Sequence, residues 1–168
     1  MKTVLNLFWQ LCLLRQSPEY VPTRGWFIAA VVVGNLLGSV LLSIAIGSEQ
    51  QTLSIVTGIV VGQATTAGLI WLALFLREHP KRLLATVTAY FGCDLIITAC
   101  YGALIPLTSS LPEMALYVSY LTFLFWSVAV TGFILHRSLS VNMAIGITVA
   151  LGIMVLSVAT SQVSIGAA

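Results

Sequence analysis

The residue best placed to do chemistry in this sequence is Asp94, which interrupts a long apolar stretch over residues 83–107. An ionised carboxylate inside a hydrocarbon layer is costly, so such a residue is expected to be protonated, hydrogen-bonded, or facing water or a partner. Asn35 and Gln63 interrupt two other apolar stretches. At 1.5 Å per helical residue, counted from one common side, Asn35 lies about 15 Å deep, Asp94 roughly 16 Å and Gln63 about 20 Å. We therefore expect a polar cluster of Asn35, Gln63 and Asp94 between three helices. It would serve either as interhelical hydrogen bonding or as a proton or substrate site.

The remaining reactive side chains form no recognisable motif. Cys12, Cys93 and Cys100 include no CxxC pair, and His79 and His136 lie far apart in the sequence. Cys93 and Cys100 are seven residues apart, which on a helix puts them about 10 Å from each other, too far for a disulfide. Metalloprotease, nucleophile-elbow, Walker and dinucleotide-binding signatures are also absent from the sequence. We therefore expect no catalytic residue, no metal site, no cofactor and no enzymatic activity.

The composition excludes an ordinary soluble domain. Hydrophobic residues make up 59% of the chain and charged residues only 7%, whereas a globular domain carries about 25% charged residues. A soluble fold of this size lacks the charge to cover its surface, so the excess apolar surface must face lipid. The formal net charge of +2 is too small to indicate a nucleic-acid partner.

The elements that must position Asp94 are apolar stretches long enough to cross a bilayer. Each provides roughly the 20 residues that a membrane span needs. These stretches cover residues 25–47, 53–76, 83–107, 114–135 and 139–158. Short linkers such as 77–82 and 108–113 force neighbouring spans to run antiparallel, and Ser110 to Glu113 reads as a capping box. We predict an all-α, polytopic transmembrane helical bundle with a five-span domain over 25–160 and a short tail over 161–168. The alternative is four spans, with the last stretch lying in the interface.

The basic residues predict how the spans are oriented. All seven fall on one side of the five-span arrangement: Lys2, Arg15, Arg24, Arg77, Lys81, Arg82 and Arg137. The positive-inside rule then places the N-terminus in the cytoplasm and the C-terminus outside. The compact loops favour a bacterial inner membrane.

The first 24 residues are expected to form an interfacial helix and a linker. Residues 4–14 are too short to span, and Thr3, Asn6 and Gln10 line one face of a helix there. Such a segment fits an amphipathic helix lying in the membrane interface. A cleaved signal peptide is the alternative, but no small-residue cleavage site follows the apolar run.

Small residues recur at helical spacing. Gly34 and Gly38 form a GxxxG pair in the first span, and Gly58 and Gly62 form another in the second. A face of the fifth span is lined by Ala144, Thr148 and Gly152. Such faces let helix backbones approach closely, with a partner in the same chain or in another.

Two segments resemble the Yip1-type membrane proteins: the lead-in from Leu14 to Pro18 and the span ending from Tyr101 to Pro106. The layout is also similar to that family, with a cytoplasmic N-terminal segment, five close-packed spans and short loops. The resemblance implies a role in membrane organisation or trafficking. The sequence has no counterpart of that family's longer N-terminal domain, and no catalytic residue carries over.

These observations favour a non-catalytic scaffold or accessory subunit of a membrane complex. Its expected partners are membrane lipids and other membrane subunits, or further copies of itself. The alternative is a small transporter or channel that works through Asp94. An intramembrane enzyme or quinone-binding protein would rest on Asp94, Tyr101 and His136 alone.

Overall fold

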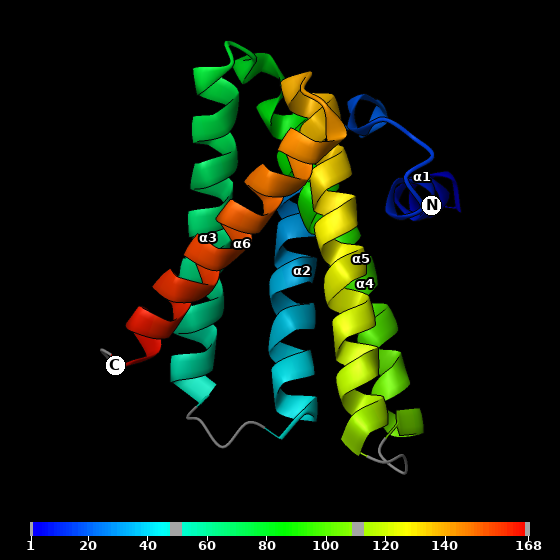
Figure 1. Ribbon diagram of the computed structural model, residues 1–168, viewed down its shortest axis with the longest axis vertical. Coiled ribbons are helices and arrows are strands. Elements are labelled where there is room, and N and C mark those ends of the chain that lie inside the picture. Colours follow the sequence, from blue (N-terminus) through cyan, green and yellow to red (C-terminus); the bar gives the residue numbers. More distant parts are fainter. Residues whose placement is uncertain (1, 48–51, 109–112, 167–168) are drawn as a thin grey trace.

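The computed structural model describes residues 2–47, 52–108 and 113–166, and over these ranges the ordered elements are all helical (Figure 1). The elements in chain order are α1 (Lys2–Cys12), η1 (Pro18–Tyr20), α2 (Gly25–Ala45), α3 (Thr52–Leu76), η2 (Pro80–Arg82), α4 (Leu83–Thr108), α5 (Glu113–Leu139) and α6 (Met143–Gly166). The five helices α2 to α6 are long and apolar enough to cross a membrane. The predicted fold class, an all-α polytopic bundle, is therefore confirmed.

Helix α4 is the central element of the bundle. Of an 18-residue apolar stretch within Pro80–Pro106, 39% is buried, against 6% of such a stretch in α2. It packs against α1, α2 and α5, while α3 packs mainly against α6, which also meets α5. Figure 1 shows α6 crossing α3 at a steep angle instead of running parallel to it. The bundle consequently has two apolar clusters, one around α1, α4 and α5 and the other among α3, α5 and α6.

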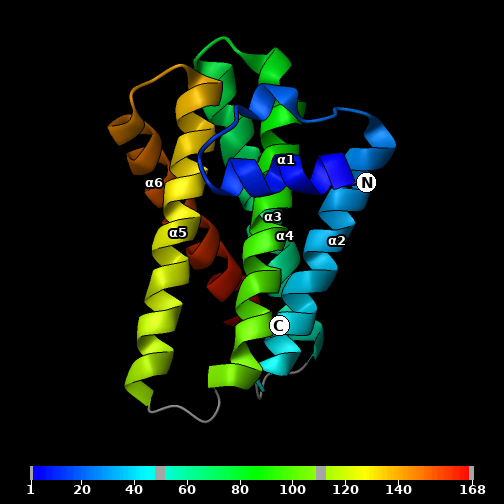
Figure 2. The same cartoon turned by 90° about the vertical axis from the view of Figure 1, so that its right-hand side faces the viewer.

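Helix α1 lies across the bundle, roughly perpendicular to α4 (Figure 2). The ring of Phe8 occupies the space that a side chain on Gly92 would need. Gly92 lies nine residues after the start of α4, which is about 14 Å along the helix axis. The side of α1 that does not face α4 exposes Leu5 and Trp9, with Asn6 between them. That mainly apolar surface suits contact with lipid.

The last two spans differ from the sequence prediction. Leu139 was predicted to begin the fifth span, but it is the last residue of α5, and α6 begins at Met143. Ser140 adopts a left-handed conformation with φ 52°, and the Asn142 side chain caps α6 by accepting a hydrogen bond from the Ile145 amide at 2.8 Å. Hydropathy alone does not show that a helix ends at Leu139, because leucine is as apolar as the residues of the two spans that the turn connects.

The predicted tail over 161–168 is also corrected, because α6 continues to Gly166. The transmembrane domain therefore reaches beyond residue 160. The capping box predicted between Ser110 and Glu113 lies largely outside the described residues.

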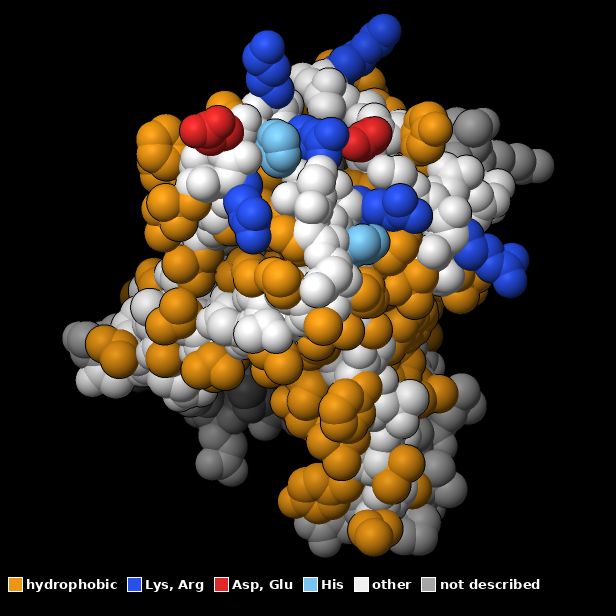
Figure 3. Space-filling model, turned by 45° about the horizontal axis from the view of Figure 1, so that its top comes forward, with side chains coloured by type: hydrophobic (Ala, Val, Ile, Leu, Met, Phe, Trp, Pro, Cys, Tyr) orange, Lys and Arg blue, Asp and Glu red, His pale blue; other side chains and the backbone are white. Residues whose placement is uncertain are grey.

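One end of the bundle carries the described basic side chains (Figure 3). We call it the basic end, and it comprises residues 13–24, 77–82 and 137–142. Below it the visible surface is mostly apolar (Figure 3). The segments that the sequence placed on one side of the membrane are thus neighbours in space.

Candidate intramembrane polar site

Asn35 joins the three predicted polar residues into one hydrogen-bonded cluster. Its side chain is completely buried. The Asn35 Nδ2 donates to Asp94 Oδ2 at 2.8 Å and to the Phe91 carbonyl at 3.2 Å. Its Oδ1 accepts a hydrogen bond from Gln63 Nε2. The structure therefore brings together Asn35 from α2, Gln63 from α3 and Asp94 from α4.

Gln63 has one hydrogen-bonding atom left over. Its Oε1 is buried and has no hydrogen-bond partner among the described residues. A buried carbonyl oxygen without a donor costs about 1–3 kcal/mol. The cluster is therefore complete only when a further group donates a hydrogen bond to it.

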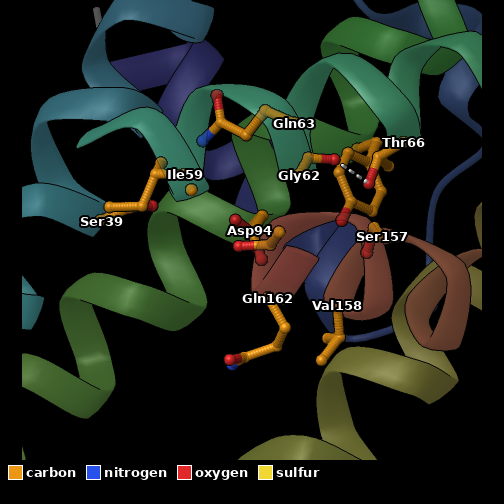
Figure 4. A pocket seen from close by; sticks show the side chains of 12 residues that line it. Ser39, Ile59, Gly62, Gln63, Thr66, Asp94, Ser157, Val158 and Gln162 are labelled. Atoms are coloured by element: carbon orange, nitrogen blue, oxygen red, sulfur yellow. Dashed lines mark hydrogen bonds between the residues drawn. The ribbon is translucent and has the colours of Figure 1, made fainter. Parts of the chain in front are cut away.

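The cluster opens onto a hollow of about 290 Å³ bounded by α2, α3, α4 and α6. Figure 4 shows Asp94 between Ser39, Gln63 and the side chains of α6. Eight of the twelve residues that line it have hydroxyl, amide or carboxyl side chains. The polar residues lining it are Ser39, Gln63, Thr66, Tyr90, Asp94, Ser157, Ser161 and Gln162.

The hollow extends toward the end of the bundle opposite the basic end. Gly58, which lines it, lies six residues after the start of α3, and Gln162 lies four residues before the end of α6. Both helix termini belong to that opposite end (Figure 1). Gln162 is exposed. The hollow is therefore reached from this end and from the side of the bundle.

Toward the basic end the hollow is closed by apolar packing. The side chains that close it come from α3, α5 and α6 and are all buried: Ile70, Leu74, Leu135, Leu139, Ala150 and Ile153. Backbones also approach closely here, since a Cβ on Gly146 would lie 2.5 Å from the carbonyl oxygen of Gly132. The site is thus open at one end and sealed at the other.

Both GxxxG pairs are used inside the chain. The Gly34 and Gly38 faces meet Leu95 of α4, and the Gly58 and Gly62 faces meet Ser161 of α6. In contrast, Ala144, Thr148 and Gly152 are exposed, and a Cβ on Gly152 would meet nothing within 4 Å. The packing partners that the sequence left open are therefore intramolecular for α2 and α3.

Sequence reasoning missed the contribution of α6 to this site. Ser157 and Ser161 are four residues apart and share a helix face, with Gln162 beside them. That spacing was a usable signal, because hydroxyl side chains at i and i+4 in an apolar span mark a polar face. Thr66 and Tyr90 gave no comparable signal, since single hydroxyls are common in membrane helices.

The other reactive residues lie elsewhere. The Cys12 Sγ donates to the Cys93 carbonyl at 3.8 Å, and the Cys93 Sγ donates to the Phe8 carbonyl at 3.9 Å, so these thiols pack α1 onto α4. His136 Nδ1 is hydrogen-bonded to the Val141 carbonyl. Over the described ranges, no group of three or more His, Cys, Asp or Glu side chains is placed to hold a metal ion.

No family model, curated protein or solved structure matches this chain. The resemblance to Yip1-type proteins therefore stays a prediction. Fold and site together define the class: an integral membrane protein of five apolar helices, four of which border an open hollow with polar side chains.

Proposed function

We propose that this chain is a small transporter or channel that binds its solute at Asp94. The observation that carries the proposal is the hollow itself, in which the Asp94 carboxyl and the hydroxyl groups of Ser157 and Ser161 line a space of about 290 Å³. Polar residues inside membrane spans usually mark a solute or ion path when they face a cavity. The role needs binding and passage, with no covalent chemistry.

The lining indicates which solutes fit. Asp94 is the only carboxylic acid among the described lining residues, and none of these residues is basic. The carboxyl and hydroxyl oxygens of the lining accept hydrogen bonds. The volume lies at the lower edge of the roughly 300–1,000 Å³ typical of ligand pockets. We therefore expect a small hydrogen-bond donor, either neutral or singly positive, or a proton.

Passage requires the sealed end to open. The backbones of α5 and α6 approach closely on that side at Gly132 and Gly146, and α6 is the steeply inclined helix. A separation of α6 from α5 at this contact would expose the hollow toward the basic end. Under the positive-inside rule that end is cytoplasmic, and we propose a bacterial inner membrane as the location.

The test uses the full chain in liposomes and in detergent. Protons, ammonium and urea serve as probes: flux is followed with a trapped pH dye or by uptake, and binding by the shift in thermal unfolding. Asp94→Asn keeps an oxygen for Asn35 to donate to but removes the charge. We expect it to abolish flux and the solute-dependent shift while leaving the protein folded.

The matched control is Glu78→Gln, which removes an exposed carboxylate from the loop at the basic end. It should leave flux and the unfolding shift unchanged. If Asp94→Asn lowers stability but leaves both solute responses intact, or if wild-type protein shows neither response to any probe, the transport proposal fails. The cluster would then be structural, with each hydrogen bond worth about 0.6 kcal/mol.

A second candidate is the accessory subunit or scaffold. The observation in its favour is the exposed small-residue face of α6, formed by Ala144, Thr148 and Gly152, onto which a helix of another subunit could pack. This role predicts co-purification of a partner in mild detergent. Gly152→Leu should release that partner while Asp94→Asn should not, which is the reverse of the transport expectation.

A further inference from the structure

A second polar hollow, of about 490 Å³, lies at the basic end of the bundle. Segments far apart in the sequence meet there: η1 in the N-terminal linker, η2 before α4, and the end of α5 with the turn that follows it. Figure 3 shows basic and histidine side chains gathered on this face. The lining residues are Ser17, Glu19, Tyr20, Arg82, His136, Arg137, Ser140 and Val141. None of them belongs to the Asp94 site.

The Arg82 guanidinium lines one side of this hollow and is held there by hydrogen bonds and an ion pair. Its Nη1 donates to the Arg137 carbonyl at 3.2 Å, the Ser138 carbonyl at 3.4 Å and the Ser140 hydroxyl at 3.1 Å. Its Nη2 lies 3.3 Å from Glu19 Oε1. A cation at the carboxyl end of a helix is favoured by the helix dipole. The guanidinium is therefore held in place by α5, and its charge is balanced by Glu19.

Arg137 supplies a charge that is not balanced. Its guanidinium carbon lies 5.5 Å from the centre of the Phe133 ring, which orients the side chain. Within the described part of the chain, no carboxylate lies within 4.0 Å of it. With one carboxylate for two arginines, the hollow carries an excess positive charge. Hydroxyl groups of Ser17, Tyr20 and Ser140 add hydrogen-bond donors.

This set of donors matches a phosphate group. Arginine binds phosphate oxygens through two parallel N–H groups, and hydroxyls can satisfy the remaining oxygens. The position identifies the source of the phosphate. Arg137 is two residues from the end of a membrane-spanning helix, at the level where lipid headgroups lie, and the nearby linker begins with exposed Leu13 and Leu14.

We infer that this hollow binds the phosphate headgroup of an anionic phospholipid in the leaflet at the basic end, with Arg137 as its principal ligand. Basic pockets between membrane helices on the positive side bind such headgroups in general. The acyl chains would lie along the exposed apolar side chains beside the linker. The bound lipid would hold the N-terminal linker against α4 and α5.

The test measures lipid binding to the full chain by native mass spectrometry from detergent. Phosphatidylglycerol is titrated against wild-type protein, Arg137→Gln and Arg77→Gln. Arg77 is an exposed basic residue of the same end that does not line the hollow. We expect Arg137→Gln to weaken binding about fivefold and Arg77→Gln to weaken it by less than about twofold, because the latter contributes only diffuse attraction.

Two further variants guard against loss of folding as an explanation. Arg137→Lys keeps the charge but not the paired N–H groups and should fall between wild type and Arg137→Gln. Glu19→Gln removes the balancing carboxylate and should strengthen binding, a sign that misfolding cannot produce. Equal losses for Arg137→Gln and Arg77→Gln would overturn the inference. So would equal binding of phosphatidylcholine, or displacement by inorganic phosphate at the same concentration as the lipid.

Discussion

Cys93 and Asp94 are consecutive residues of α4, but the two faces they lie on have opposite character. On the Cys93 face, α1 lies across the helix, and Leu11 and Cys12 are completely buried. The Trp126 Nε1 donates to the Cys12 carbonyl at 2.9 Å and fixes the end of α1 there. On the Asp94 face, the neighbours are polar side chains and a hollow of about 290 Å³.

The difference follows from what each face has to pack against. Consecutive helical residues point about 100° apart, so α4 can present both faces at one depth. A short crossing helix closes the first face completely. The second faces α6, which is inclined and leaves the outer part of the interface open. The comparison shows that a membrane span can have two different faces inside the bundle even when none of its faces is exposed to water. In α4 the polar side chains lie on the face where packing against other helices is incomplete.

We call the Asp94 face of α4 the polar face. The largest effect on the free energy of unfolding is expected when the hydrogen-bonded cluster at its centre is disrupted. Asn35→Leu removes the two hydrogen bonds to Asp94 and Phe91 and the one from Gln63. It also leaves the Asp94 carboxyl without its donor. We expect the free energy of unfolding to fall by about 3 kcal/mol, combining weak intramembrane hydrogen bonds with an unsatisfied buried group. Titration with a denaturing detergent measures this change.

Thr148→Leu is the control for that substitution. It also replaces a polar side chain by leucine in a span, but at an exposed position of α6. Its effect should stay within about 0.5 kcal/mol. If Asn35→Leu is no more disruptive than Thr148→Leu, the polar face contributes nothing to the fold and the contrast between the two faces has no energetic basis.

We call the Cys93 face of α4, which is covered by α1, the dry face. Disrupting its packing should lower the free energy of unfolding by somewhat less than Asn35→Leu does. Gly92→Leu inserts a side chain into the space occupied by the Phe8 ring, so α1 must move. Overpacking of this kind costs about 2 kcal/mol. We also expect the buried Cys12 and Cys93 thiols to become reactive toward a maleimide. Gly68→Leu is the matched control, because a Cβ at Gly68 meets nothing within 4 Å. Unchanged labelling in Gly92→Leu would mean that α1 is not sealed against α4.

Sequence alone predicted the polar face better than the dry one. Depth along each span is set by helical rise, so Asn35, Gln63 and Asp94 were predicted to share a level, and they are hydrogen-bonded to one another. Depth does not fix rotation or tilt. The inclination of α6, and with it the hollow, depends on packing of α5 against α6 that no single span encodes.

The dry face was missed because its signals are weak in sequence. Cys12 and Cys93 are separated by 81 residues, and each reads as an ordinary small apolar residue. Gly92 is a single glycine outside any GxxxG pair, although it is the position where α1 crosses. The start of the fifth span was misplaced for a related reason, since apolar helix and apolar turn residues have the same hydropathy.

The smallest effect concerns Gly62, which sequence reasoning assigned to close helix packing. A Cβ at this position would lie 3.6 Å from both the Ser157 carbonyl oxygen and the Ser161 Cβ, which is ordinary contact. Since glycine within a helix is less favourable than alanine by about 0.5–1 kcal/mol, Gly62→Ala should stabilise the protein by roughly that amount.

The contrasting variant is Gly146→Ala, whose Cβ would lie 2.5 Å from a backbone oxygen that cannot move aside. That substitution should destabilise the protein by about 1–3 kcal/mol. A loss of stability in Gly62→Ala comparable to that in Gly146→Ala would mean that α3 and α6 pack as closely beside the hollow as α5 and α6 do at the sealed end, and the hollow would then be too narrow for a solute.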